Sequence, residues 1–533
     1  MSKLYFPFIV FALFVSVVSS SCGRNKNRHG AKSRDMLLRG GLNHHSNLPF
    51  DSNLVTAFYN AYPELKKYRQ DVSEVYRQHT YTQIWFDKQG VVEFGQTLYG
   101  KVRDLTSEGV LSKFPYQSKI DGVFRTDREN TLSPTETDLM LTNLYLFYAK
   151  KVYKGIDDTT TTDLGWLLPR KQAPYAALLD SVMSDPALLS RNDSVLFSQY
   201  YRLRDVLKRY REIEKKGGWP PIDIDPKLKA YKPGDTAKAI LQIRARLLIT
   251  GDIRQNNGSN RYDSELVAAV KKYQLRNGYN ADIKISPRHI KEMNVPIGER
   301  IKKIIVNMER CRWISPEFGN AKNYIVVNIP SYKLSLVRNG KVEFESPVIV
   351  GENVTKTVIF SGMLSYIVFS PYWNLPQSII AREVKPGMAK HKNYLEAHHM
   401  EWNNGQVRQK PGKNNSLGLV KFIFPNVDDI YMHDTPAKSL FSKEHRAFSH
   451  GCIRIAKPRD FAVEILKDDP EWSPLKIDAA MHGGKELTCL VKPKIPVYIG
   501  YLTAWVNQQG EINFYEDIYE RDARLAALLI GGN

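Results

Sequence analysis

The stretch from Tyr431 to Ile455 reads YMHDTPAKSLFSKEHRAFSHGCIRI and places one cysteine, Cys452, near three histidines and two arginines. The whole chain of 533 residues contains only four cysteines. A cysteine is nucleophilic only as the thiolate, so a catalytic cysteine needs a base or a positive charge close by. The stretch therefore holds a cysteine nucleophile with its base, a metal site, or a chance gathering of polar residues.

The residues on either side of Cys452 favour the first of these readings. Gly451 allows the backbone to pass close to a reacting carbonyl, and the consecutive N–H groups of Gly451 and Cys452 can bind an oxyanion. Arg454 follows two residues later, which in a strand puts it on the same face as Cys452. In that position the guanidinium can stabilise the thiolate or bind a carboxylate.

The order H-D-T-P at residues 433–436 and S-H-G-C-I-R at residues 449–454 resembles the catalytic domain of the L,D-transpeptidase family. The cysteine follows the first histidine by nineteen residues. The resemblance implies that Cys452 is the nucleophile and that His433 is its base. It also implies a motif around the cysteine, formed by Ser449, His450 and Gly451, and a substrate site that includes Arg454, Tyr431 and Trp373.

The charge of the chain indicates an anionic partner. The formal net charge is +20, and nucleic acid, an acidic glycopeptide or a membrane surface would each fit it. The N-terminus separates these options, because an apolar run from Leu4 to Val18 follows Lys3 and is too short for a membrane span. Small residues come next, which is the pattern of an export signal, so we expect no nucleic acid partner.

Three serines precede Cys22, as in a bacterial lipoprotein processing site that leaves the cysteine as the acylated N-terminus. A soluble export signal with cleavage nearby is the alternative. We expect residues 1–22 to form the signal, Cys22 to carry lipid and residues 23–50 to form a basic tether. This predicts an exported, periplasmic protein that its N-terminal lipid anchors to a membrane.

Apolar positions recur at helical spacing in the next part of the chain, which predicts an α-helical scaffold domain over residues 51–222. The apolar face of its last helix is expected to hold Leu196, Tyr200, Leu203, Leu207 and Tyr210.

Residues 227–296 read as a bundle of three short amphipathic helices, with Asp235 and Asp263 as expected N-caps. The bundle resembles the peptidoglycan-binding domain type 1 family, although Tyr273 stands where that family usually has Phe. Its role is either wall binding or that of a spacer. A linker is predicted over residues 297–322.

From Tyr324 the hydrophobic period becomes that of strands, and Asn339-Gly340 between two alternating runs predicts a hairpin. We expect a β-rich, sandwich-like catalytic domain over residues 323–497, with a lid insertion at 371–420. Residues 498–533 read as a C-terminal tail without recognisable chemistry. The predicted fold class is therefore multidomain α+β.

The resemblance implies acyl transfer between peptidoglycan stem peptides. Cys452 would attack the third residue of a tetrapeptide donor and release D-Ala, and the amine of an acceptor stem would resolve the thioester into a 3-3 cross-link. No nucleotide-binding motif occurs, and the exchange of one amide for another needs no cofactor. Carbapenems are expected to acylate Cys452.

Other functions stay open at this point. Resolution of the thioester by water would make the protein an L,D-carboxypeptidase, and an inert catalytic domain would leave a non-catalytic wall-binding lipoprotein. A zinc site would draw on His433, His445, His450 and Cys452, but no convincing third ligand is available, so no metal is expected.

The remaining cysteines allow two arrangements. Cys311 and Cys489 can form a disulfide that leaves Cys452 free, or all three can be free thiols.

Overall fold

The computed structural model describes residues 50–530, except positions 88, 126, 169, 171–173, 186–187, 189–195 and 316–321. The export signal, the lipidation site Cys22 and nearly all of the basic tether lie outside the described residues and stay predictions. None of the described helices combines the length and the apolar character needed to cross a membrane.

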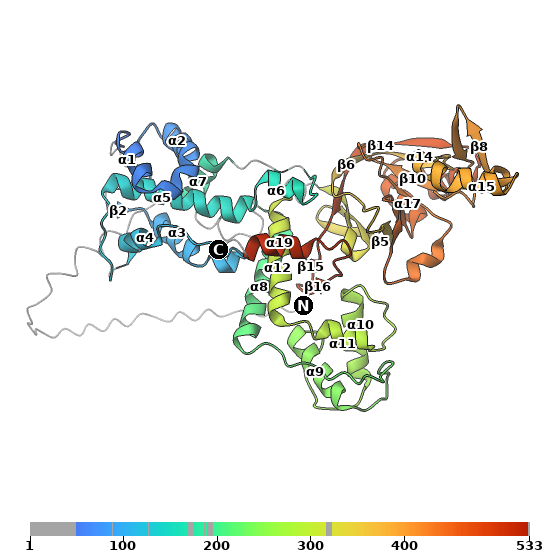
Figure 1. The fold of residues 1–533 in the computed structure, drawn as a ribbon, viewed down its shortest axis with the longest axis horizontal. Coiled ribbons are helices and arrows are strands. Elements are labelled where there is room, and N and C mark those ends of the chain that lie inside the picture. Colours follow the sequence, from blue (N-terminus) through green and yellow to red (C-terminus); the bar gives the residue numbers. More distant parts are fainter. Residues whose placement is uncertain are drawn as a thin grey trace, which may run out of the picture.

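Figure 1 shows an elongated molecule with helices at one end and a large sheet at the other. The helical region contains a two-stranded pair, β1 (Phe86–Asp87) and β2 (Gly90–Val91). Its helices are α1 (Leu54–Ala61), α2 (Arg69–Gln78), α3 (Glu93–Arg103), α4 (Gln117–Phe124), α5 (Pro134–Ala149), α6 (Asp158–Asp163), α7 (Tyr175–Ser184) and α8 (Ser198–Lys215).

Helix α5 is the centre of this region. Its start is fixed by a capping box, in which Ser133 and Glu136 satisfy each other's backbone N–H groups. From Thr137 to Ala149 every side chain of α5 is buried, because other helices surround it. The predicted apolar face of α8 is also buried, as expected.

Helix α12 (Ile297–Arg312) occupies most of the segment that the sequence assigns to a linker, and it packs lengthwise against α8. Buried polar contacts fix it in the helical region. The Glu309 carboxylate accepts hydrogen bonds from Trp313 and from the Ile156 N–H, and Arg312 donates to the carbonyl oxygens of Glu108 and Val152. One continuous hydrophobic core therefore extends from the helical region through α12 into the sheet.

The bundle has a hydrophobic core of its own and consists of α9 (Lys238–Thr250), α10 (Ser264–Arg276) and α11 (Pro287–Met293). The predicted cap of α10 is confirmed, since Asp263 accepts a hydrogen bond from the Leu266 N–H. The prediction for Asp235 is wrong. Its carboxylate accepts from the Lys232 N–H and so closes a turn before α9, whose N-cap is Ala237.

The sheet belongs to the predicted β-rich domain. In spatial order its strands are β12 (Ala447–Ser449), β5 (Lys341–Gly351), β13 (Ile453–Ile455), β11 (Met432–His433), β10 (Val420–Ile423), β6 (Ser361–Phe369), β14 (Leu487–Gly500), β3 (Asn323–Asn328) and β4 (Lys333–Arg338). Strand β5 also pairs with β4, so the sheet closes on itself. The predicted hairpin is confirmed, because Asn339 and Gly340 both have positive φ in the turn between β4 and β5.

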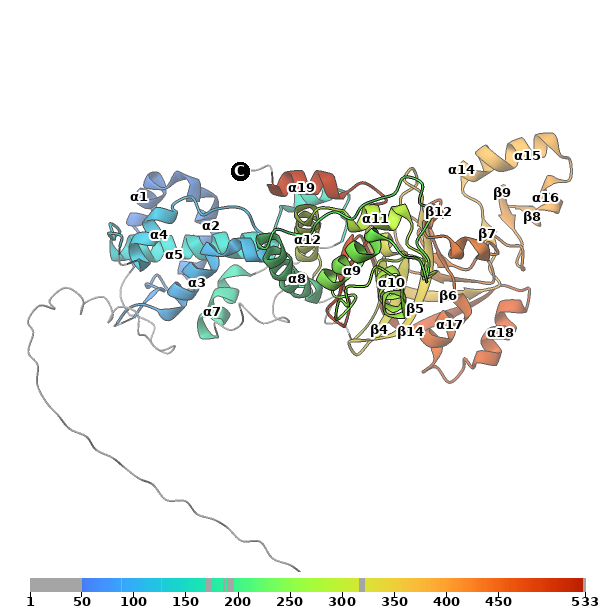
Figure 2. The same ribbon diagram turned by 90° about the horizontal axis from the view of Figure 1, so that it is seen from below.

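Two helices accompany the sheet, α17 (Pro458–Leu466) and α18 (Pro474–His482). The insertion after β6 projects beyond the sheet, as Figure 2 shows. It comprises β7 (Trp373–Asn374), α14 (Gln377–Ile379), α15 (Lys385–Lys390), α16 (Tyr394–Ala397), β8 (Met400–Asn403) and β9 (Gln406–Gln409). A small separate core of Leu375, Ile380, Val384 and Val407 holds it together.

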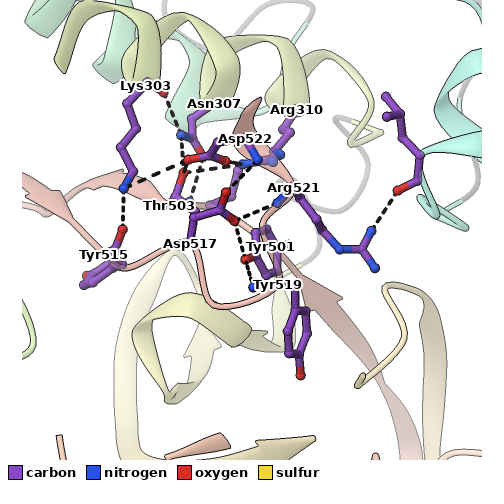
Figure 3. Close-up of polar contacts among 12 residues, drawn as sticks. Lys303, Asn307, Arg310, Tyr501, Thr503, Tyr515, Asp517, Tyr519, Arg521 and Asp522 are labelled. Atoms are coloured by element: carbon purple, nitrogen blue, oxygen red, sulfur yellow. Dashed lines mark hydrogen bonds and ion pairs between the residues drawn. The ribbon is translucent and has the colours of Figure 1, made fainter. Parts of the chain in front are cut away.

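The C-terminal segment is an ordered part of the fold. It continues from β14 through β15 (Ala504–Val506) and β16 (Ile512–Phe514) to α19 (Asp522–Ile530), which packs on α12. Figure 3 shows the polar contacts that join it to α12. Arg310 pairs with Asp522 at 2.6 Å, and Asn307 exchanges hydrogen bonds with Thr503.

Candidate active site

Cys452 lies in the tight turn between β12 and β13, and its side chain is half-buried. The turn requires glycine at position 451, where φ is +118°. Strand β13 runs parallel to β11, with Met432 opposite Ile453 and His433 opposite Arg454. Opposite residues of neighbouring strands share a face, and so do residues two apart, so Tyr431, His433, Cys452 and Arg454 gather on one side of these strands.

His433 is the most buried ionisable group of this cluster, with 5% of its surface exposed. Its Nδ1 donates a hydrogen bond to the carbonyl oxygen of Asp434 at 2.5 Å. Burial lowers the pKa of His433 to about 3, with Arg454, Lys421 and Lys438 as further causes. The imidazole is therefore neutral near pH 7, and its Nε2 carries no proton.

The thiol of Cys452 is also neutral at rest. Burial raises its pKa, and the contacts with Tyr431 and the charge of Arg454 oppose that rise. Its Sγ lies 3.9 Å from the carbonyl oxygen of Asp429. Because burial lowers the pKa of His433 and raises that of Cys452, the resting site is a neutral pair rather than a thiolate–imidazolium ion pair. No hydrogen bond joins this thiol to His433 within the described chain.

The remaining predicted substrate residues lie around this pair. The Tyr431 hydroxyl contacts both the Cys452 thiol and the Trp373 side chain, and burial raises the pKa of Tyr431. The rings of Tyr431 and His433 meet edge to face at 5.7 Å. Since Trp373 belongs to β7, the insertion contacts Tyr431 through this tryptophan.

Arg454 is partly buried, and burial lowers the pKa of its guanidinium while the nearby Cys452 opposes that shift. Lys421 lies in β10, which pairs with β11 on the side away from β13, and it stands opposite His433 in that pairing. Neither cation forms an ion pair with a carboxylate within the part of the chain that the structure describes. Two positively charged side chains thus flank His433 on the face that carries Cys452.

The Gly451 N–H has a different role from the one that the sequence suggested, because Ser449 binds it. The Ser449 hydroxyl accepts a hydrogen bond from the Gly451 N–H at 3.2 Å and donates to the Cys452 carbonyl oxygen at 2.5 Å. The expectation of two consecutive oxyanion donors is therefore wrong, because the Gly451 N–H is already occupied. The Cys452 N–H meets no acceptor among the described residues and stays available.

His450 is exposed to solvent, whereas its neighbours Ser449 and Gly451 are buried. His445 is exposed as well and lies 3.2 Å from the Tyr332 hydroxyl. Among the described residues no three side chains of His, Cys, Asp or Glu are placed to bind a metal ion. Cys311, Cys452 and Cys489 are all free thiols, which decides between the two arrangements left open by the sequence.

Thr357 and Tyr519 support the Cys452 turn without any signal in the sequence. Thr357 is fully buried after β5, and its hydroxyl donates to the Gly451 carbonyl oxygen at 2.8 Å. Tyr519 comes from the C-terminal segment and accepts a hydrogen bond from the Thr357 N–H at 3.1 Å. These contacts join residues 94 and 162 positions apart, and no local pattern in the sequence signals them.

Cavity size does not locate this site. A cavity of about 960 Å³ lies between α10, the sheet and the β15–β16 hairpin, and its lining includes Tyr324, Lys333, Tyr498 and Trp505. None of the predicted catalytic or substrate residues lines it. The site is instead defined by the side chains that converge on the turn at Cys452.

Comparisons with known proteins agree with this geometry. Residues 322–474 match the family model of the L,D-transpeptidase catalytic domain, and residues 70–207 match the model of a scaffold domain. A protein from Haemophilus influenzae that is named as a presumed L,D-transpeptidase is 34% identical over 245 residues. The match covers 42% of this chain and 49% of that protein, so the chain spans about half the length of this relative.

Similarity to solved structures is more distant. An L,D-transpeptidase in complex with imipenem shares 14% identity over 33% of this chain and 58% of its own, with a TM-score of 0.19. An L,D-transpeptidase from Mycobacterium smegmatis shares 12% identity over the same fractions, with a TM-score of 0.20. Such low scores say nothing about the arrangement of the whole chain. The two family models show that the chain contains an L,D-transpeptidase catalytic domain over residues 322–474 and a scaffold domain over residues 70–207.

Proposed function

We propose that the chain is a peptidoglycan L,D-transpeptidase that forms 3-3 cross-links through an acyl-enzyme on Cys452. The observation that carries this proposal is the convergence of Cys452, a neutral His433 and Arg454 on one face of β11 and β13. Arg454 forms no ion pair among the described residues. The single proton on Nδ1 leaves Nε2 of His433 as a base for the thiol.

The reaction follows from these groups. Nε2 of His433 takes the thiol proton as Sγ of Cys452 attacks the carbonyl carbon of the third residue of a tetrapeptide donor. The N–H of Cys452 stabilises the tetrahedral oxyanion. Collapse of the intermediate breaks the bond to D-Ala, whose amine receives the proton from His433, and leaves a thioester on Cys452.

The second half-reaction repeats this chemistry. The side-chain amine of an acceptor stem attacks the thioester carbonyl, His433 takes a proton from the amine, and the thiolate leaves and is reprotonated. One amide bond has then replaced another, so no external energy source is consumed.

The flanking cations favour an anionic donor. Arg454 is partly buried and forms no ion pair with a carboxylate among the described residues, and Lys421 interacts with the charge of Glu486 without a close ion pair. A buried charge is most stable when it is paired. Tyr431 and Trp373 add an aromatic wall on the side of the insertion. A stem peptide with a free carboxylate meets both requirements.

The test is a product analysis with a disaccharide-tetrapeptide and the Cys452→Ala variant as control. The proposal predicts cross-linked dimers and free D-Ala from the wild type, and neither from the variant. Shortened monomeric stems without dimers would indicate an L,D-carboxypeptidase. No product and no D-Ala from the wild type would contradict catalysis and favour a wall-binding protein.

We also propose export to the periplasm and a membrane anchor on Cys22, on the strength of the N-terminal sequence pattern. An N-terminal lipid would hold the catalytic domain near the wall. Metabolic labelling with a fatty acid tests this, because Cys22→Ala should abolish incorporation.

A carbapenem is proposed as an inhibitor for a chemical reason. Its strained amide carbonyl can accept the same attack by Cys452 and form a thioester. Intact mass after incubation should increase by one carbapenem in the wild type and stay unchanged in Cys452→Ala.

A further inference from the structure

The turn that carries Cys452 is held by residues from three distant parts of the chain. Thr357 comes from the loop after β5, Gly451 from the turn itself, and Tyr519 from the C-terminal segment. Thr357 forms a buried hydrogen bond with each of the other two residues. Their geometry decides in which direction the Gly451–Cys452 peptide points.

Thr357 fixes this peptide through its carbonyl group. The Thr357 hydroxyl donates to the Gly451 carbonyl oxygen at 2.8 Å and accepts from the Gly351 N–H at 2.9 Å. In a trans peptide the C=O and N–H bonds point in opposite directions. The Cys452 N–H therefore points away from Thr357, to the side where no described residue accepts it.

Tyr519 in turn fixes Thr357. The Tyr519 hydroxyl donates to the Gly351 carbonyl oxygen at 2.7 Å and accepts from the Thr357 N–H at 3.1 Å. The Tyr519 hydroxyl therefore bridges Gly351 and Thr357, the two ends of the loop that follows β5. Gly351 has no room for a side chain, because a Cβ would lie 2.0 Å from the Thr355 carbonyl oxygen.

The C-terminal segment holds Tyr519 in place, as Figure 3 shows. The Tyr519 N–H donates to the Tyr501 hydroxyl at 2.8 Å, and their rings stack with centroids 5.5 Å apart. The Tyr501 hydroxyl donates to Asp517 at 2.6 Å. Through Asp522 and Arg310 the same segment is fixed to α12.

We propose that Thr357 and Tyr519 are positioning residues that aim the Cys452 N–H at the oxyanion of the acyl-transfer reaction. The C-terminal segment is then part of the catalytic apparatus, although it touches no substrate. This inference rests on the proposed acyl-enzyme chemistry.

The experiment compares two reactions of the same thiol in the full chain. Acylation by the tetrapeptide donor develops an oxyanion, whereas alkylation by iodoacetamide develops none. A residue that only supports the fold, or only sets the thiol pKa, changes both rates together. A residue that aims the N–H changes acylation alone.

Thr357→Val removes the hydroxyl without changing the size of the side chain. It should lower the acylation rate about 100-fold, the usual effect of losing an oxyanion donor, and change alkylation less than about threefold. Thr357→Ser keeps the hydroxyl and should restore acylation to within about threefold of the wild type. Tyr519→Phe acts through Thr357 and should lower acylation about tenfold.

Tyr262→Phe is the matched control, because it removes a buried hydroxyl that donates to the Ile283 carbonyl oxygen in the bundle. It should leave both rates unchanged. Melting temperatures identify any variant that has lost its fold.

Two results would overturn the inference. One is acylation of Thr357→Val at the wild-type rate, and the other is an equal fall of acylation and alkylation in a folded Thr357→Val. A wild type that forms no acyl-enzyme would contradict the proposed function itself, and the inference would fall with it.

Discussion

The carbonyl oxygen of Asp434 accepts a hydrogen bond from Nδ1 of the neighbouring His433 at 2.5 Å. A carbonyl can only accept, so the imidazole proton resides on Nδ1. Burial beside three cations keeps the ring from gaining a second proton. This single contact gives His433 the tautomer that a general base for Cys452 requires.

Replacement of His433 by Gln should abolish base assistance while keeping a side chain that can still donate to Asp434. We expect the rate of acylation by the tetrapeptide donor to fall by about 10²- to 10⁴-fold, as is usual for loss of a general base. Rapid-quench mass spectrometry measures it. A variant that acylates as fast as the wild type would show that another group takes the thiol proton.

The pH dependence of alkylation tests the neutral state of the Cys452 thiol. Burial holds the pKa of this thiol above its ordinary value, and only the thiolate reacts with iodoacetamide. The alkylation rate should therefore rise about tenfold per pH unit from pH 6 to beyond pH 8. A plateau across this range would indicate a thiolate–imidazolium pair at rest.

His433 should also make stability depend on pH. Its pKa is about 3 in the folded protein and about 6.5 when unfolded, so the unfolded state binds more protons between these values. Stability is then lost as pH falls through this window, by up to about 1.4 kcal/mol per pH unit.

The measurement for this prediction is thermal unfolding of the wild type and His433→Gln from pH 7 to pH 4. All other titrating groups are shared, so the difference between the two curves reports His433. The wild type should lose melting temperature relative to the variant as pH falls. Parallel curves would contradict a depressed pKa.

Gly451→Ala tests the backbone of the Cys452 turn. A Cβ at this position meets its nearest atom only at 3.9 Å, so the cost comes from φ of +118° and not from a clash. Such a conformation costs a residue with a side chain about 1–3 kcal/mol, and relaxation would misplace the Cys452 N–H. We expect lower stability together with much slower acylation.

Gly510→Ala is the control for this substitution, because Gly510 also has positive φ, +77°, in an open turn. It should lower stability and leave acylation unchanged. Equal acylation by both variants would show that the turn at Gly451 tolerates a change of backbone.

Asp522→Ala tests how the C-terminal segment is anchored. It leaves Arg310, which is 3% exposed, without its carboxylate partner. Loss of one partner of a buried pair costs about 3–5 kcal/mol. Calorimetry should show a clearly lower melting temperature, whereas Asp478→Ala, which breaks an exposed pair with Arg459, should change it little.

The centre of the site could be predicted from sequence because it depends on local rules. The H-D-T-P and S-H-G-C-I-R motifs identify His433 and Cys452 by resemblance, and strand alternation places Arg454 on the face of Cys452. The parallel pairing of β11 with β13, which brings Tyr431 and His433 to the same face, has no local signal in the sequence. Gly451 could likewise be recognised as a position where the backbone can pass close to a reacting carbonyl. Its N–H could not be assigned, because the partner is a side-chain hydroxyl whose rotamer the sequence does not reveal.

The roles of helix α12 and of the C-terminal segment could not be predicted, because they depend on long-range contacts. Helix α12 has apolar residues at helical spacing, but its buried Glu309, Arg310 and Arg312 make the segment look like a solvated linker. The C-terminal segment appeared to carry no chemistry because Tyr519 acts on residues more than 160 positions away. Hydrogen bonds of this range have no periodic signature.

The most direct test of the account is intact-mass spectrometry of the purified chain after brief incubation with disaccharide-tetrapeptide, in parallel with Cys452→Ala. The wild type should carry an adduct equal to the donor minus D-Ala, and the variant should carry none. An unmodified wild type without D-Ala release, or an adduct of the same mass on Cys452→Ala, would contradict the account.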